Sequence, residues 1–194
     1  MRWLVFAIAI TAATPAFADD GYFFQESIGG ASYAGELGRY PGAPRLQFGA
    51  GVRRGSWTYE AFGAATIPDF LYIDCYGSEC AYASRPTAGL AEFGVDVRKR
   101  WRLLNLRRWG KPGVYERPGL FVALHGGPRW FWADQALDGY SGPGLGGGGA
   151  IEGDLWILGY FMDVGIDVMR LRGPDGTIHG STPYLMFGAK VGWL

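Results

Sequence analysis

The feature that most constrains the fold is a long alternation of apolar and polar residues with a period of two. Its clearest stretch runs from Trp156 to Val168, where every second residue is large and apolar. Successive side chains of a β-strand point to opposite faces, so this stretch predicts one apolar and one polar face. Strands in soluble proteins usually have about 5–6 residues, whereas a tilted membrane-crossing strand needs about 9–11. The length of the alternation therefore favours a membrane β-barrel.

Weaker forms of the same pattern divide residues 19–194 into eight segments. They span residues 22–37, 44–54, 56–66, 87–104, 117–132, 145–153, 155–172 and 178–194. We therefore expect an all-β fold, an eight-stranded antiparallel up-and-down transmembrane β-barrel.

The connections between these segments alternate in length, as they do in a barrel built from hairpins. Tight turns define a short-turn end of the predicted barrel, at residues 54–56 and 153–154. Longer connections and one further turn define a long-loop end, at residues 38–43, 67–86, 133–144 and 173–176. The connection 105–116 is long for the short-turn end. We expect the protein to meet its surroundings mainly through the loops 67–86 and 133–144.

Composition narrows the possible partners. The 194 residues carry 18 basic and 18 acidic side chains, and this balance argues against nucleic acid, because phosphate binding needs clustered Lys and Arg. The charged fraction of 19% is low for a soluble surface, and the 33 glycines are more than twice the usual share of about 7%. Eight strands enclose a narrow interior, so small inward residues leave room for charged ones.

Residues 1–18 have the features of a secretory signal peptide. A basic start is followed by the apolar stretch Trp3 to Ile10 and by the A-x-A site Ala16-Phe17-Ala18. The apolar stretch is shorter than the roughly 20 residues of a membrane-spanning helix. We expect cleavage after Ala18 and a mature barrel domain over residues 19–194.

Tryptophan positions predict two aromatic belts. Four tryptophans fall near strand ends at the short-turn end: Trp57, Trp101, Trp156 and Trp193. Two others fall towards the long-loop end, with tyrosines such as Tyr72 and Tyr76 nearby: Trp130 and Trp132. Amphipathic rings settle at the headgroup level of a bilayer, so two belts separated by an apolar band indicate a membrane crossing.

Charged side chains gather on the faces predicted to point into the barrel. They are Arg53, Glu60, Glu92, Asp96, Arg98, Arg100, His125, Asp163 and Asp167. Carboxylates in a cleft are candidates for acid–base chemistry, but an unpaired buried charge is costly. We therefore expect opposite charges to pair across a salt-bridged lumen, in place of a wide pore or an active site. His125 is expected to be a hydrogen-bonded interior histidine.

Cys75 and Cys80 lie in the longest predicted loop. In an oxidising, exported compartment a nearby even pair predicts a disulfide that stiffens the loop. A metal site would need further Cys or His ligands close by, and the loop has none. We expect no metal and no cofactor.

These features resemble the eight-stranded outer-membrane barrels of the OmpA/OmpX-like kind. The resemblance covers residues 19–194 and rests on the signal peptide, on strand patterns such as Gln47-Phe48-Gly49-Ala50-Gly51-Val52, and on the C-terminal strand Tyr184 to Leu194. Barrels of this class usually end on an aromatic residue read by the barrel-assembly machinery, whereas here Leu194 follows Trp193. The resemblance implies an outer-membrane protein of a Gram-negative bacterium, in contact with lipid and lipopolysaccharide. We expect a monomer with a structural or surface-interaction role.

An enzymatic interpretation concerns His179 and Ser181. Residues i and i+2 of a strand share a face, so the imidazole could reach the hydroxyl on the predicted lipid side. The pair resembles the His-x-Ser pair of outer-membrane lipid A deacylases, in which a glutamate orients the histidine. In that family the pair lies on the penultimate strand, whereas here it begins the last one. Glu36, near the outer end of the first segment, is the candidate glutamate.

A third interpretation is a soluble, periplasmic, lipocalin-like barrel that binds an apolar ligand. Its strands would also alternate, but their apolar faces would line the interior.

Overall fold

The computed structural model describes residues 20–67, 73–76, 79–82, 87–105, 119–155 and 158–193. The predicted signal peptide, Tyr72, Trp156 and Leu194 lie outside these residues. The backbones of Cys75, Tyr76, Cys80 and Trp193 are described, but their side chains are not. Among the described residues, no helix is long and apolar enough to cross a bilayer.

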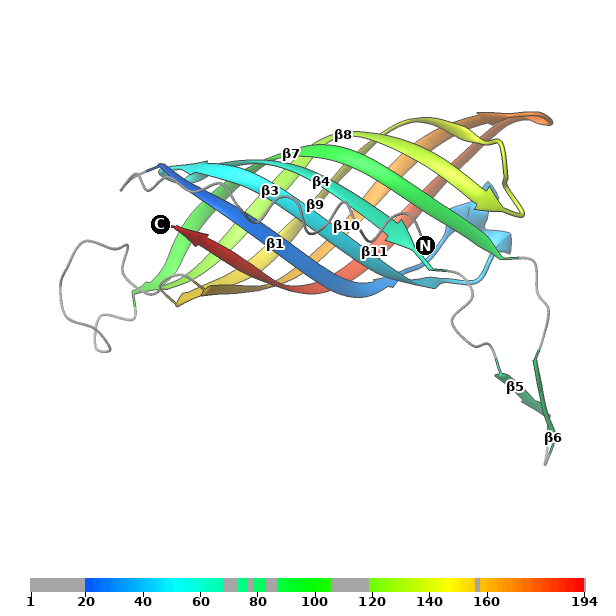
Figure 1. Cartoon of the computed structure of the whole chain (residues 1–194), viewed down its shortest axis with the longest axis horizontal. Coiled ribbons are helices and arrows are strands. Elements are labelled where there is room, and N and C mark those ends of the chain that lie inside the picture. Colours follow the sequence, from blue (N-terminus) through cyan, green and yellow to red (C-terminus); the bar gives the residue numbers. More distant parts are fainter. Residues whose placement is uncertain are drawn as a thin grey trace.

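Eight long antiparallel strands form a closed ring (Figure 1). In ring order they are β1 (Asp20–Ala31), β3 (Ala43–Arg54), β4 (Trp57–Thr66), β7 (Ala88–Asn105), β8 (Gly119–Gln135), β9 (Ser141–Leu155), β10 (Leu158–Gly173) and β11 (Gly176–Trp193). The first and last strands close the ring, because β1 pairs with β11 from Tyr22 opposite Trp193 to Ala31 opposite Tyr184. The predicted all-β, eight-stranded, up-and-down architecture is confirmed.

The stagger of the strands makes the barrel narrow and its strands steeply tilted. Starting from Tyr22 and stepping from each residue to the one directly opposite on the next strand, a path around the ring ends at Pro183 of β11. The Pro183 carbonyl oxygen accepts a hydrogen bond from the Ser32 amide, next to the end of β1. The path thus returns to the first strand ten residues further along, from position 22 to position 32. For eight strands this shear corresponds to a tilt of about 40°.

The predicted first strand, residues 22–37, is wrong beyond Ala31. The chain leaves the ring there and forms β2 (Ala34–Gly35) and the 3₁₀ helix η1 (Glu36–Arg39), and β2 pairs with β11. Gly35 has a φ of 68°, a left-handed conformation that glycine adopts without steric cost. The turn allows the Leu37 side chain to become fully buried at the long-loop end.

The predicted boundaries of β8 and β9 are also wrong. β8 continues to Gln135 and β9 begins at Ser141, so the predicted loop 133–144 shrinks to a tight connection. The predicted turn at 153–154 lies within β9, where Asp154 pairs with Gly119 of β8 and Gly159 of β10 and its side chain is buried in the barrel interior. The glycines of this region suggested a loop, yet they pair in register with β8 and β10.

The turns at Gly55 and at Pro174-Asp175 lie where the sequence predicts them, at opposite ends of the barrel (Figure 1). Most of the loop 67–86 lies outside the described residues, but two short strands, β5 (Ile73–Tyr76) and β6 (Glu79–Tyr82), pair within it. Their register sets Cys75 directly opposite Cys80. The disulfide stays a prediction, because neither sulfur is among the described atoms.

The outward face of the ring is apolar. On β10, six alternating residues from Leu158 to Val168 expose 40–58% of their surface. Similar side chains face outward on the other long strands, among them Ile28, Phe48, Tyr59, Phe93, Leu124, Ile151 and Phe187. The apolar face predicted from the alternation therefore points away from the barrel interior.

The interior at the long-loop end is also apolar. We call this cluster the apolar cap; its buried members are Tyr33, Leu37, Tyr40, Ala88, Leu90, Phe131, Leu137, Tyr140, Met169 and Leu171. Burial raises the pKa of the Tyr33 phenol above its usual range, so its hydroxyl stays protonated and donates to the Ala88 carbonyl oxygen at 2.9 Å. Leu37 and Leu137 come from outside the long strands, so the chain folds back over its own opening.

Candidate functional site

Below the apolar cap, the barrel interior is filled with charged side chains, which we call the charged lumen. Among the described residues, six basic and seven acidic ones are buried: Arg45, Arg53, Arg98, Arg100, Arg129 and Lys190, and Glu60, Glu92, Asp96, Glu152, Asp154, Asp163 and Asp167. His125 joins them with a side chain that is 2% exposed. The structure thus places all nine predicted lumen residues in one interior, together with five that were not predicted.

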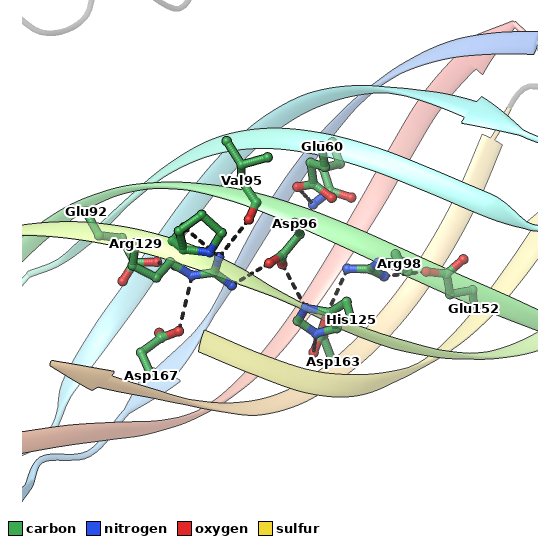
Figure 2. Close-up of polar contacts among 12 residues, drawn as sticks. Glu60, Glu92, Val95, Asp96, Arg98, His125, Arg129, Glu152, Asp163 and Asp167 are labelled. Carbon is green, nitrogen blue, oxygen red and sulfur yellow. Dashed lines mark hydrogen bonds and ion pairs between the residues drawn. The ribbon is translucent and has the colours of Figure 1, made fainter. Parts of the chain in front are cut away.

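Two arginines hold the part of the lumen nearest the cap. The Arg45 guanidinium lies 2.7 Å from Glu92 Oε1 and 2.7 Å from Asp167 Oδ2. Arg129 Nη2 lies 2.7 Å from Asp96 Oδ1, and its Nε lies 3.4 Å from Asp167 Oδ1 (Figure 2). Each carboxylate on β7 and β10 at this level therefore faces at least one arginine from β3 or β8.

His125 connects this upper cluster to the middle of the lumen (Figure 2). Its Nδ1 lies 2.8 Å from Asp96 Oδ2 and its Nε2 lies 3.0 Å from Asp163 Oδ1. An ionised carboxylate only accepts hydrogen bonds, so with Asp96 and Asp163 both ionised each ring nitrogen donates and the imidazolium is cationic. Among the described residues, the interior then holds seven basic and seven acidic side chains.

Glu152 is the centre of the cluster nearest the short-turn end. Arg98 bonds to Glu152 and also lies 3.1 Å from Asp163 Oδ2. Arg100 Nε and Lys190 Nζ each lie 2.8 Å from an oxygen of Glu152. One carboxylate therefore faces three cations from two strands.

Asp154 completes this cluster towards the short-turn end. Its Oδ2 lies 2.5 Å from Arg100 Nη2 and 3.3 Å from Arg53 Nη1. Contacts between opposite charges thus run without a break from Arg45, next to the cap, to Arg53.

Inward glycines make room for these long side chains. A Cβ at Gly146 would lie 2.0 Å from Asp167 Oδ1 and 2.7 Å from Arg129 Nε. A Cβ at Gly94 would lie 2.7 Å from Arg129 Cδ, and one at Gly49 would overlap the Glu60 carboxylate. The glycine excess of the sequence is therefore partly a requirement of the charged interior.

The arrangement suits ion pairing rather than acid–base chemistry. Six of the seven buried carboxylates contact a cation, and the seventh, Glu60, accepts a hydrogen bond from the Gln25 side-chain amide. Among the described residues, no group of three His, Cys, Asp or Glu side chains is arranged to hold a metal ion.

Sequence reasoning missed five lumen residues: Arg45, Arg129, Glu152, Asp154 and Lys190. Arg129 shares the parity of His125 on β8, but Gly126-Gly127-Pro128 interrupts the alternation between them. Glu152 and Asp154 lie on β9, whose many glycines hide the period of two. Residues separated by an even number of positions share a face of a strand. The inward position of Arg53 therefore also predicts an inward Arg45, and that of Tyr184 predicts an inward Lys190.

The enzymatic candidates lie outside the barrel, at the long-loop end. His179 is exposed and Ser181 is half-buried opposite Ala34. Barrel closure does bring Glu36 to His179, but the carboxylate accepts a hydrogen bond from the His179 backbone N–H. Within the described part of the chain, no hydrogen bond joins the His179 ring to Ser181 or to Glu36. The three side chains are near one another without forming a base–nucleophile relay.

The described tryptophan side chains lie near the two ends of the apolar band. Trp57 and Trp101 are exposed at the short-turn end, where Lys99 Nζ lies 4.5 Å from the Trp57 ring. Trp130 and Trp132 are exposed towards the long-loop end. Trp132 lies opposite Ala91, ten residues along β7 from Trp101. That separation is about 33 Å along the strand and about 25 Å along the barrel axis at a tilt of about 40°.

No protein-family model matches the chain, and no curated protein matches it. Among solved structures it is similar to the crystal structure of Neisserial surface protein A, with a TM-score of 0.59 and 11% sequence identity. The match covers 92% of this chain and 99% of that chain. The likeness is one of architecture: two closed antiparallel barrels share a fold although few of their residues are the same.

Proposed function

We propose that this chain is a small outer-membrane β-barrel of a Gram-negative bacterium, exported by the signal peptide at residues 1–18. The observation that carries the proposal is the inverted surface of the ring, with large apolar side chains outside and paired charges inside. Exposing apolar surface to water costs about 25 cal/mol per Å², whereas acyl chains accept it. A closed ring also leaves no strand edge unpaired, as the interior of a bilayer requires.

The height of the apolar band supports the same placement. The described tryptophans bracket a band of about 25 Å, which is the height of the outward apolar band in outer-membrane barrels. Lys99 beside Trp57 lies at the boundary, where its ammonium group can extend to the headgroups.

The filled interior supports a structural or surface-interaction role, with a salt-bridged lumen rather than a wide pore. The charged lumen occupies the centre of the barrel and the apolar cap closes one end. The surface that remains for interaction is the long-loop end, with η1, the β5–β6 hairpin and the turn between β8 and β9 (Figure 1). In this proposal the barrel is of the OmpA/OmpX-like kind, is inserted by the barrel-assembly machinery, and contacts outer-membrane lipid and lipopolysaccharide.

The charged interior argues against the lipocalin-like interpretation. A barrel that binds an apolar ligand lines its cavity with apolar side chains, whereas this lumen is lined by Arg, Glu and Asp. The two proposals predict different cell fractions.

Fractionation of cells expressing the full chain tests the placement. We expect the protein in the outer-membrane fraction, without residues 1–18, and with two gel mobilities that depend on heating, because a folded barrel resists detergent until heated. Recovery in the soluble periplasm would contradict the proposal and favour the lipocalin-like one. Planar-bilayer recordings of the purified protein should show no large, steady conductance, and a steady pore would contradict the filled lumen.

A further inference from the structure

The outward face of β1 carries one residue that does not suit an apolar environment. Glu26 is exposed on the outward face, on the same side of the strand as Tyr22 and Ile28, while Gln25 and Ser27 point inward. Among the described residues, no side chain forms a hydrogen bond or an ion pair with Glu26. The carboxylate therefore has no partner within the described part of its own barrel.

The register gives the depth of Glu26. It lies opposite Phe48, which lies opposite Gly63, six residues along β4 from Trp57. Six residues along β4 correspond to a rise of about 15 Å along the barrel axis. Because the strands are tilted, the directly opposed residue on the previous strand lies about 3 Å lower, and two such steps lead from β4 through β3 to β1. Glu26 is thus about 9 Å above the level of Trp57, in the middle part of a band about 25 Å tall.

Among the described residues, no other charged side chain faces outward at this depth. Arg54 and Lys99 lie at the level of Trp57, Arg170 lies at the level of Trp132, and Asp134 and Arg172 lie beyond Trp132. A carboxylate in acyl chains finds no hydrogen-bond donor, because lipid headgroups lie at the edges of the bilayer. A charged residue in the acyl-chain region costs free energy, and such residues usually form a hydrogen bond or an ion pair with a partner inside the membrane.

Small residues adjoin Glu26 on part of the outward face. Ala189 of β11 lies directly opposite it and Ala50 of β3 lies diagonally opposite, whereas the exposed Phe48 lies directly opposite on β3. Ala61 and Gly63 continue this small-residue area on β4. Small side chains allow two backbones in a membrane to approach closely, so that a short polar contact can form between them.

We propose that Glu26 is the central contact of a symmetric dimer of this chain, formed laterally in the membrane through the outward faces of β1, β3 and β11. The inference rests on the membrane placement proposed above. A two-fold axis brings the same residue of two copies together. A carboxylic acid both donates and accepts hydrogen bonds, so Glu26 and Glu26 of the partner subunit can satisfy each other.

The chemistry of this pair is specific. A glutamine in both copies can make an equivalent amide pair, whereas leucine cannot. A dimer departs from the monomer expected from the sequence, in which the weak alternation of the first segment does not place Glu26 on the outward face.

Cross-linking in vesicles tests the dimer. The full chain, carrying Cys75→Ser and Cys80→Ser, is refolded into phosphatidylcholine vesicles, and insertion is checked by heat-dependent gel mobility. One variant adds Ala189→Cys beside Glu26, and its matched control adds Leu124→Cys on β8, which is three strands from β11 and four from β1 in the ring. A short bis-maleimide should link two copies at position 189 and not at position 124.

Substitution of Glu26 completes the test. We expect Glu26→Leu to lower the linked fraction about tenfold, as the loss of one or two hydrogen bonds in a membrane would. Glu26→Gln should retain it. Absence of linkage at 189 in inserted protein, equal linkage at 124, an unchanged Glu26→Leu variant, or loss in both variants would overturn the paired-carboxyl dimer. Failure to insert into vesicles would instead overturn the membrane placement and the dimer with it.

Discussion

The apolar cap and the charged lumen fill two parts of one barrel by different physical means. The cap takes Leu37 and Leu137 from segments outside the long strands and packs them against Phe131 and Leu171. The lumen uses side chains of the strands alone, held by contacts between opposite charges on neighbouring and on more distant strands. The cap gains stability from apolar burial and can adjust its packing, whereas each lumen charge depends on partners at fixed strand positions. The lumen is therefore the region less tolerant of single substitutions.

The largest expected effect is in the lumen, at Glu152. Glu152→Gln keeps the volume of the side chain and removes the charge that Arg98, Arg100 and Lys190 share. Breaking a buried ion pair from one side costs about 3–5 kcal/mol. Urea unfolding of the refolded barrel in vesicles measures this, with exposed Asp175→Asn as the matched control. If the two variants were equally stable, the lumen contacts would contribute little.

A smaller effect is expected in the cap. Leu37→Ala leaves a cavity in a fully buried apolar site, and such truncations cost about 2–5 kcal/mol. We expect a value near the lower end of that range, because η1 is a short segment that can settle into the space. Leu37→Met is the control and should change the unfolding free energy much less. A loss larger than that of Glu152→Gln would reverse the ranking of the two regions.

Substitution of His125 tests whether the charges at the two ends of the lumen are energetically coupled. His125→Leu removes the bridge between Asp96 and Asp163, but Asp96 still contacts Arg129 and Asp163 still contacts Arg98. We expect a loss of about 1.5–3 kcal/mol, the range for hydrogen bonds to charged groups. A double-mutant cycle with Glu152→Gln measures the coupling through Arg98. A coupling energy of zero would show that the upper and lower clusters act independently.

The smallest effect is expected outside both regions. Ser181→Ala alters a half-buried residue that belongs to neither the cap nor the lumen, so its unfolding free energy should change by no more than about 0.5 kcal/mol. The acylation pattern of lipid A in cells expressing this variant should match that of cells expressing the wild type. A difference between the two lipid patterns would restore the enzymatic interpretation of His179 and Ser181.

The alternation of apolar and polar residues predicts the two faces of a strand correctly where the apolar residues are large. The faces of β10 follow directly from the residues between Leu158 and Val168, and the same parity placed Asp163 and Asp167 inside. It failed on β9, where glycines on both faces leave no contrast, and so Glu152 was missed. It also misled at residues 33–37, because an apolar Leu37 fits either a continuing strand or a segment that folds back into the barrel.

Partners across the ring could not be predicted from a single strand. His125 meets Asp96 and Asp163, which are 29 and 38 residues away along the chain. Which charges meet depends on the shear of the closed barrel, and shear is fixed only when the register of all eight strands is known. The same closure reveals that Glu26 faces outward, because the first segment has little alternation of its own.

Spin labels at single sites test the proposed contact between the outward face of the strands and lipid. In the full chain carrying Cys75→Ser and Cys80→Ser and refolded into vesicles, single cysteines for labelling replace Met162, Val164 or Ile166 on β10. Asp175 in the β10–β11 turn is replaced as the water-exposed control. We expect apolar oxygen to relax the three strand labels more strongly than a water-soluble nickel complex does, and the turn label to show the opposite order. Strand labels that the nickel complex reaches as readily as the turn label would contradict the proposed contact.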